Sequence, residues 1–232
     1  MNNQFQRTEI LIGTENLNKL KNQTIAIFGI GGVGSYIAEA LARVGIGNLI
    51  LIDNDLIDIT NLNRQIHATH ETIGKPKVEE MKKRIQAINP EAKVQAIQEF
   101  VTEKNIQEIL NEKVDYIIDA IDTVKSKLEI INFAKQKNIP IISSMGTANK
   151  LDPTKLEVTD IYKTTNCPLA KIMRKELRKR EISNLKIVYS TEQPKPSHQN
   201  QDGTQTLGSI SFVPSTAGLI IAAEVVREII KM

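Results

Sequence analysis

Short apolar runs alternate with longer amphipathic stretches along the first two thirds of the chain. Runs rich in Ile and Val, bounded by polar or glycine residues, predict buried strands at residues 24–28, 48–53, 93–97, 116–120 and 141–145. Between them, apolar residues recur every three or four positions. This second pattern predicts helices at residues 35–44, 77–89, about 105–110, and 124–136. The order predicts an α/β fold with a doubly wound, Rossmann-like, mostly parallel sheet.

The pattern changes after Gly146. Strands are predicted at residues 156–160 and 186–189, and a basic helix begins near Pro168 between them. A last apolar helix runs to Ile230. These elements predict a C-terminal extension to the sheet.

We interpret the 232 residues as one domain. Residues 1–146 form a nucleotide-binding core, and residues 147–232 form a substrate-binding extension of the same domain. The polar segment 192–208 contains prolines and glycines, which predicts a mobile loop. Two interpretations stay open for that loop: a lid over a site, or a segment without function.

Composition narrows the class of protein. The chain is 41% hydrophobic and 25% charged, which suits one globular domain with a substantial core. Its one cysteine, Cys167, excludes an internal disulfide and a four-thiol zinc site, and favours a reducing cytoplasm. The first twenty residues lack the apolar run of a signal peptide. The apolar stretch 217–223 is too short to span a bilayer of about 30 Å.

A glycine loop between the first strand and the first helix predicts a nucleotide site. Its glycines are Gly29, Gly31, Gly32 and Gly34. They allow a tight turn and a close approach to phosphate, at a helix N-terminus whose free N–H groups attract anions. Asp53 follows at the distance expected of a carboxylate that binds ribose hydroxyls. The alternative is a tight turn without a ligand.

Three further polar residues favour a triphosphate over a dinucleotide. Asn61, Arg64 and Lys77 follow shortly after Asp53, and a hydride-transfer site does not need two cations there. Arg64 can fork onto phosphate oxygens, and Lys77 can act as a point charge beside a pyrophosphate. Alternatively, both cations are ordinary solvated surface.

The motifs together resemble a known superfamily. They read Gly-x-Gly-Gly-x-Gly, Asp-x-Asp, Asn-Leu-x-Arg-Gln, Gly-x-Pro-Lys and Asp-Ala-x-Asp, in that order. The chain is similar to the adenylyltransferases that include ubiquitin-activating enzymes and the bacterial activators of sulfur-carrier proteins. The resemblance implies that a substrate carboxylate attacks ATP and forms an acyl-adenylate and pyrophosphate.

The resemblance also implies roles for particular residues. Catalysis would depend on Arg7, Arg64, Lys77 and Asp122. Asp122 would hold magnesium, and Arg7 would reach the phosphates from the other subunit of a homodimer. The remaining contacts to ATP would come from the glycine loop, Asp53, Asp55 and Asn61.

The basic helix suggests a polyanionic partner. Eight Lys or Arg residues stand between positions 163 and 186 inclusive, against two glutamates. Leu169, Ile172, Met173 and Leu177 are predicted to form its apolar stripe. The residues expected to contact a polyanion such as RNA are Lys171, Arg174, Lys175, Arg178, Lys179 and Arg180. A solvated helix face is the alternative, since the net charge is only +3.

The C-terminal motifs resemble one branch of the superfamily, the tRNA threonylcarbamoyladenosine dehydratases. They run from Cys-Pro-Leu-Ala at residues 167–170 to Gly-Ser-Ile-Ser-Phe-Val-Pro at 208–214. The branch implies that ATP activates the carboxylate of the modified adenosine, and that a ring then closes with net loss of water. Gln4 departs from the basic residue expected there. The resemblance leaves open whether sulfur-relay proteins or monovalent ions assist.

Two other functions remain open. In an enzyme that activates a ubiquitin-like or sulfur-carrier protein, Cys167 would be the acceptor thiol, in an exposed polar segment before the basic helix. A regulatory module that binds nucleotide without catalysis would leave Arg7, Arg64, Lys77 and Asp122 without a role. His67 and His70 have the spacing of metal ligands on a helix but lack a third ligand, and we interpret them as ordinary polar residues.

Overall fold

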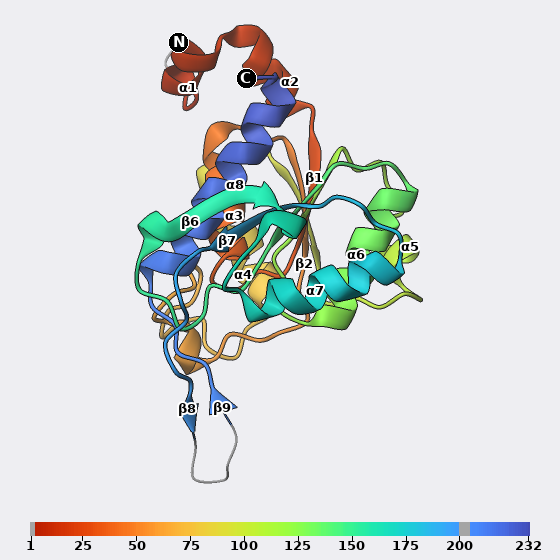
Figure 1. Cartoon of the computed structure of the whole chain (residues 1–232). Coiled ribbons are helices and arrows are strands. Elements are labelled where there is room, and N and C mark those ends of the chain that lie inside the picture. The colour runs from red at the N-terminus through yellow and green to blue at the C-terminus, as the bar shows by residue number, and fades with distance from the viewer. Residues whose placement is uncertain (1–2, 200–204) are drawn as a thin grey trace.

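A computed structural model describes residues 3–199 and 205–232. In this part of the chain, seven strands form one sheet with the order β3-β2-β1-β4-β5-β7-β6 (Figure 1). The strands are β1 (Thr24–Phe28), β2 (Asn48–Ile52), β3 (Lys93–Ile97), β4 (Tyr116–Asp119), β5 (Ile141–Ser144), β6 (Leu156–Asp160) and β7 (Lys186–Ser190). Only the pairing of β6 with β7 is antiparallel in this sheet. The predicted doubly wound, mostly parallel sheet is confirmed.

Helices cover both faces of the sheet (Figure 1). The helices on one face are α3 (Gly34–Val44), α4 (Lys77–Ile88) and α8 (Phe212–Ile230). Those on the other face are α5 (Ile106–Ile109), α6 (Val124–Gln136) and α7 (Pro168–Lys179). The alternation of side chains along each strand explains the two cores. Ile25 and Ile27 of β1 pack with the first set, while Ala26 and Phe28 pack with the second.

The strand order places a crevice at one end of β1. This strand pairs with β2 on one side and with β4 on the other. The connections that leave β1 and β4 therefore run in opposite directions, over opposite faces of the sheet. Open α/β sheets bind ligands at such a switch point, outside the carboxyl ends of the strands.

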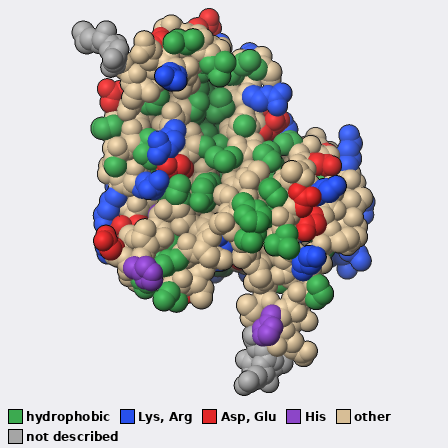
Figure 2. Space-filling model, turned by 90° about the vertical axis from the view of Figure 1, so that its left-hand side faces the viewer, with side chains coloured by type: hydrophobic (Ala, Val, Ile, Leu, Met, Phe, Trp, Pro, Cys, Tyr) green, Lys and Arg blue, Asp and Glu red, His purple; other side chains and the backbone are tan. Residues whose placement is uncertain are grey.

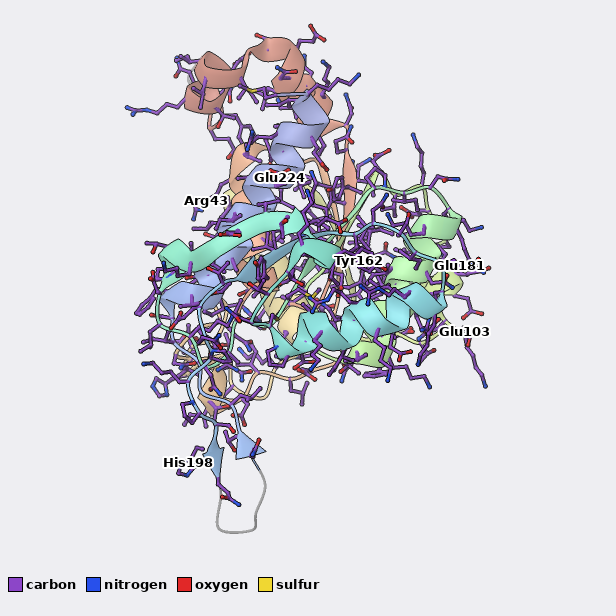
Figure 3. The ribbon with its side chains drawn as sticks, in the orientation of Figure 1. Arg43, Glu103, Tyr162, Glu181, His198 and Glu224 are labelled. Atoms are coloured by element: carbon purple, nitrogen blue, oxygen red, sulfur yellow. The ribbon has the colours of Figure 1, made fainter. Side chains whose placement is uncertain are left out.

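Two regions differ from the expectation. The N-terminal segment, which carried no predicted helix, forms α1 (Gln6–Ile12) and α2 (Thr14–Lys21). Within the predicted mobile loop 192–208, β8 (His198–Gln199) and β9 (Gln205–Thr206) pair as a hairpin. Figures 1 and 3 show this hairpin, with the labelled His198, projecting from the body of the domain. Residues 200–204 lie outside the described part of the chain.

Asn149 anchors both ends of that hairpin segment. Its backbone N–H donates to the carbonyl of Gly208 at 2.8 Å, and its carbonyl accepts from Lys195 N at 2.7 Å. The side-chain Oδ1 accepts from Gly208 N at 2.5 Å. The described parts of segment 192–208 are therefore tied to the loop after β5, and its ends are not free.

The amphipathic pattern of α7 differs at one position. Ala170, Met173 and Leu177 are fully buried, whereas Ile172 is 49% exposed. The prediction that Ile172 belongs to the buried stripe is wrong, because the helix turns this position outward. No helix in residues 3–199 and 205–232 has the length and apolar character to span a membrane.

Candidate active site

A cleft of about 660 Å³ opens at the carboxyl ends of the central strands. Its walls come from the glycine loop after β1, the segments after β2 and β3, and the loops after β4 and β5. Leu207, Gly208 and Ser209 of the C-terminal extension close one side. The predicted core and the extension therefore share one site.

Two glycines of the loop are required by close packing. Gly29 has a φ of 87°, in the left-handed region, and a Cβ there would lie 2.7 Å from the carbonyl oxygen of Ala120. A Cβ on Gly34 would lie 1.7 Å from the carbonyl oxygen of Gly29. Gly34 does not line the cleft, whereas Gly31 does, with nothing closer to its Cβ position than the Gln65 side chain at 3.9 Å. The backbone at Gly31 is thus open to a ligand.

Asp53 links the glycine loop to the end of β2. Its Oδ2 accepts from Ile30 N at 2.6 Å, and its Oδ1 accepts from Asp55 N at 2.8 Å. Burial raises the pKa of the Asp53 carboxyl, while the positive charge of Lys77 and the two backbone N–H groups oppose that rise. The carboxylate lies on the cleft wall, where the sequence predicts a ribose ligand.

Lys77 and Asp55 form an ion pair inside the cleft. The Nζ of Lys77 lies 2.6 Å from Asp55 Oδ2, and Lys77 is only 5% exposed. Lys77 is the first residue of α4, and its backbone N donates to the carbonyl of Asp55 at 3.1 Å. Both residues were predicted to bind ATP. The ion pair between them was not predicted, and it holds the Lys77 ammonium in one place.

Arg64 lies against the glycine loop. Its Nη1 donates to the Thr60 carbonyl at 2.8 Å and to Asn63 Oδ1 at 2.9 Å. Its Cγ lies 3.2 Å from the Cβ position of Gly32. Asn61 supports this segment, because its Oδ1 accepts from Asp58 N at 3.2 Å in a capping box. The other guanidinium N–H groups of Arg64 have no hydrogen-bond partner among the described residues, so a ligand could accept from them.

The two acids of the Asp-Ala-x-Asp motif have different surroundings. Asp122 is exposed and lines the cleft. Asp119 is fully buried and paired with Lys127, so it does not face the cleft. The described residues contain no group of three or more His, Cys, Asp or Glu that could hold a metal. A lone carboxylate beside bound phosphates nevertheless fits Mg²⁺, which keeps several water ligands.

Arg7 does not line the cleft. It is exposed on α1, which lies near the start of β1, whereas the cleft lies at the other end of that strand (Figure 1). The structure therefore brings together Arg64, Lys77 and Asp122, and leaves Arg7 apart from them within one chain.

The basic residues of α7 divide into two groups. Four are engaged within the chain: Arg174 donates to the Thr164 carbonyl at 3.1 Å, Arg178 lies 5.4 Å from the Tyr162 ring centroid, and Lys179 and Arg180 pair with Glu176. Figure 3 shows the labelled Tyr162 beside this helix. Lys171 and Lys175 are exposed, and their side chains have no partner in residues 3–199 and 205–232. Leu169 lines the cleft, so α7 begins at the site.

Cys167 is buried, at 5% exposure, and its Sγ accepts from Ala170 N at 3.5 Å. The expectation of an exposed thiol is wrong, because this residue caps α7. Sequence reasoning also missed Phe100 and Leu207, which are exposed on the cleft wall. Neither belongs to a motif, and only their place in the fold reveals them.

His67, like Cys167, is buried, and the sequence did not predict this burial. Both ring nitrogens are buried without a hydrogen-bond partner in the described residues. Burial lowers the pKa of His67 to about 4, and the nearby charges of Lys77 and Arg84 act in the same direction. His70 is exposed, as expected of an ordinary polar residue.

Comparison with known proteins identifies the family of the chain. The profile of the ThiF family matches residues 4–232. The chain belongs to the ThiF family. It is 44% identical over 244 residues to the tRNA threonylcarbamoyladenosine dehydratase of Bacillus subtilis, a match that covers 100% of this chain and 96% of that protein.

Solved structures of one such dehydratase have the same fold. The Escherichia coli tRNA N6-threonylcarbamoyladenosine dehydratase in complex with AMP superposes with a TM-score of 0.92 at 35% identity, covering 98% of this chain and 94% of that one. The same enzyme in complex with ATP gives a TM-score of 0.90, with equal identity and coverage. The predicted resemblance to the adenylyltransferases and to their dehydratase branch is confirmed.

Proposed function

We propose that this protein is an ATP-dependent tRNA threonylcarbamoyladenosine dehydratase of the cytoplasm. One observation carries the proposal. A chain similar over its whole length to these dehydratases holds two cations and a carboxylate, Arg64, Lys77 and Asp122, around a single cleft at the switch point of its sheet. That set suits a magnesium–triphosphate complex.

The reaction has two steps. A carboxylate oxygen of the threonylcarbamoyl group attacks the α-phosphorus of ATP, the bond to pyrophosphate breaks, and an acyl-adenylate forms. A nucleophilic atom of the same side chain then attacks the activated carbonyl carbon and loses a proton, and AMP leaves as the five-membered ring closes. The second step needs no enzyme thiol, because the nucleophile is held within the same molecule. The buried setting of Cys167 accords with this route and not with a thiol acceptor.

We assign the residues of the cleft as follows. Lys77, aimed by Asp55, and Arg64 neutralise the phosphate charge that develops as pyrophosphate leaves. Asp122 would hold magnesium, which would supply positive charge to offset the charge of the phosphates. Asp53 accepts hydrogen bonds from the ribose hydroxyls, and the open backbone at Gly31 lies against phosphate.

A homodimer would complete the site with Arg7 from the partner subunit. Two observations support this. Arg7 lies away from the cleft of its own chain, and exposed apolar side chains form a surface that a second subunit could bury. Ile10 and Leu11 of α1 are 77% and 82% exposed, and Leu219 of α8 is 49% exposed. Figure 2 shows hydrophobic side chains gathered on the face that includes the left-hand side of Figure 1. Mixing Arg7→Ala with Asp122→Ala subunits should restore about a quarter of the activity, because half of the dimers would hold one intact site of two.

The tRNA would lie along α7, whose first turn borders the cleft. Lys171 and Lys175 are its uncommitted cations and would contact phosphates. The reconstituted reaction, run with and without added sulfur-relay proteins, tests whether such a protein assists.

The decisive experiment is incubation of the purified protein with ATP, magnesium and tRNA that carries threonylcarbamoyladenosine. Nucleoside mass spectrometry should show conversion to a product one water lighter, with AMP formed in equal amount. Asp122→Asn protein is the matched control. Hydrolysis of ATP without a change in the nucleoside mass would contradict the proposal, and a requirement for added relay proteins would appear as activity only in their presence.

A further inference from the structure

A buried ion pair lies directly beneath the loop that carries Asp122. Lys127 of α6 and Asp119 at the end of β4 are both fully buried, and Lys127 Nζ lies 2.8 Å from Asp119 Oδ2. Such pairs are a poor source of stability, because the loss of hydration offsets the attraction, and apolar replacements are often neutral or stabilising. The position of this pair under the cleft points to a different role.

The pair holds both peptide groups of Ile121. Ile121 N donates to Asp119 Oδ1 at 3.2 Å, and the Ile121 carbonyl accepts from Lys127 Nζ at 2.8 Å. The second hydrogen bond fixes the peptide group that joins Ile121 to Asp122. The direction in which the Asp122 side chain leaves the backbone is therefore set from below the cleft.

The same ammonium also holds the neighbouring loop. Lys127 Nζ donates at 2.8 Å to the carbonyl of Ser144, the last residue of β5 and part of the cleft wall. Ser143 Oγ in turn donates to Asp119 Oδ2 at 2.5 Å. A lysine ammonium has three donors, and here three oxygen atoms accept them. One side chain thus joins the ends of β4 and β5.

The loop after β4 has a further neighbour that cannot move easily. Gly29 packs so closely on Ala120 that a Cβ would lie 2.7 Å from its carbonyl oxygen. The loop is therefore held by the glycine loop on one side and by Lys127 from below. If the Ile121 carbonyl shifted, Asp122 would move with it, whereas the glycine loop would stay in place.

We infer that Lys127 is a positioning residue that aims the Asp122 carboxylate at magnesium–ATP through the carbonyl of Ile121. The inference rests on the proposed function, in which Asp122 holds the metal. Lys127 is fully buried and touches no substrate, so it acts only through the two loops that it joins.

The test is the double variant Asp119→Asn/Lys127→Met. It removes both charges together, so no unpaired charge stays buried, and the introduced amide keeps an oxygen that can accept from Ile121 N. ATP–pyrophosphate exchange with modified tRNA gives kcat, KM for ATP, and the magnesium concentration at half-maximal rate. We expect kcat to fall about ten- to hundredfold and the half-maximal magnesium concentration to rise, with KM for ATP at saturating magnesium and the thermal unfolding temperature near the wild-type values.

Lys186→Met is the matched control. It removes a lysine that pairs with Glu224 at 2.7 Å and lines a pocket at the opposite end of the sheet, so neither kcat nor the magnesium dependence should change. If the double variant does not fold, Asp119→Asn/Lys127→Gln replaces it, since an amide supplies one of the lost donors. That variant should show the same shift to a smaller degree, and an unchanged magnesium dependence would overturn the inference.

Asp122→Asn, measured in the same assay, separates the two hypotheses. If Asp122→Asn raises the half-maximal magnesium concentration and the Lys127 variants do not, the positioning role is overturned and the proposed function stands. If Asp122→Asn itself leaves the magnesium dependence unchanged, the magnesium role of Asp122 is wrong, and the inference about Lys127 falls with it.

Discussion

The cleft at the carboxyl ends of the parallel strands and the basic helix α7 both present clustered cations, but neighbouring residues hold the two clusters differently. In the cleft, Lys77 is held by Asp55 at 2.6 Å, and Arg64 is held by a carbonyl and an amide, while both still line the open space. On α7, four of the six basic side chains are engaged with neighbours, and within the described part of the chain only Lys171 and Lys175 have no partner.

The difference shows when a cluster of charged residues in the sequence predicts that their side chains share one site. Residues that follow parallel strands meet at one edge of the sheet, so their spacing along the chain indicates that they share a site. A run of cations on a helix has no such constraint. Intrahelical pairs with Glu176 and contacts to Thr164 and Tyr162 decide which charges remain for a partner.

The largest expected effect is in the cleft. Lys77→Met should lower the rate of adenylation about a thousandfold, a loss of roughly 4 kcal/mol of transition-state stabilisation, because a fixed ammonium beside the phosphates is removed. The matched control is Lys75→Met, an exposed lysine two residues earlier. Single-turnover measurement of pyrophosphate release distinguishes them, and equal rates for Lys77→Met and Lys75→Met would remove Lys77 from the site.

His67, between Arg64 and Lys77 in the sequence, should make the free energy of unfolding depend on pH. The folded-state pKa of His67 is about 4, below the 6.5 of the unfolded chain, so the unfolded chain binds the proton more strongly. The free energy of unfolding should therefore fall as pH drops from about 6.5 to 4, by about 3 kcal/mol from this residue.

Urea unfolding across that pH range checks the prediction for His67. His67→Phe should lose this part of the pH dependence, whereas His70→Phe, at an exposed position, should keep it. The same pH dependence in wild type and in His67→Phe would show that other groups cause it.

On α7, the uncommitted cations should matter more than the paired ones. The double variant Lys171→Glu/Lys175→Glu should weaken tRNA binding, and the negative slope of log affinity against log salt should become shallower by about two units. The matched double variant Lys179→Glu/Arg180→Glu changes the same net charge at residues paired with Glu176 and should have a smaller effect. Equal losses from both would mean that total charge matters and not the geometry of the helix.

The smallest effect is expected at the start of the same helix. Cys167→Ser should leave the cyclisation of threonylcarbamoyladenosine in tRNA nearly unchanged. The thiol is buried and caps α7, and a hydroxyl can replace it in that role. The nucleoside mass assay measures this, with circular dichroism as the check on folding. A folded but inactive Cys167→Ser protein would favour a thiol intermediate.

Much of the core was determined by the sequence itself. Strands and helices appear within a few residues of their predicted positions, because each apolar run is local and has a clear period. Gly29, Asp53, Arg64, Lys77 and Asp122 line one cleft as their motifs indicate, since the ends of parallel strands must meet there. The family resemblance, rather than any periodicity, supplied the chemistry.

Tertiary structure alone decided which polar side chains pair and which are buried. Asp55 with Lys77, and Asp119 with Lys127, are matched by side-chain directions that no local pattern encodes. His67 and Cys167 lie inside because neighbouring elements cover them, although both occur in polar stretches. The physical reason is the same in each case: backbone periodicity is a local property, whereas burial and ion pairing depend on residues that are distant along the chain and meet only in the folded state.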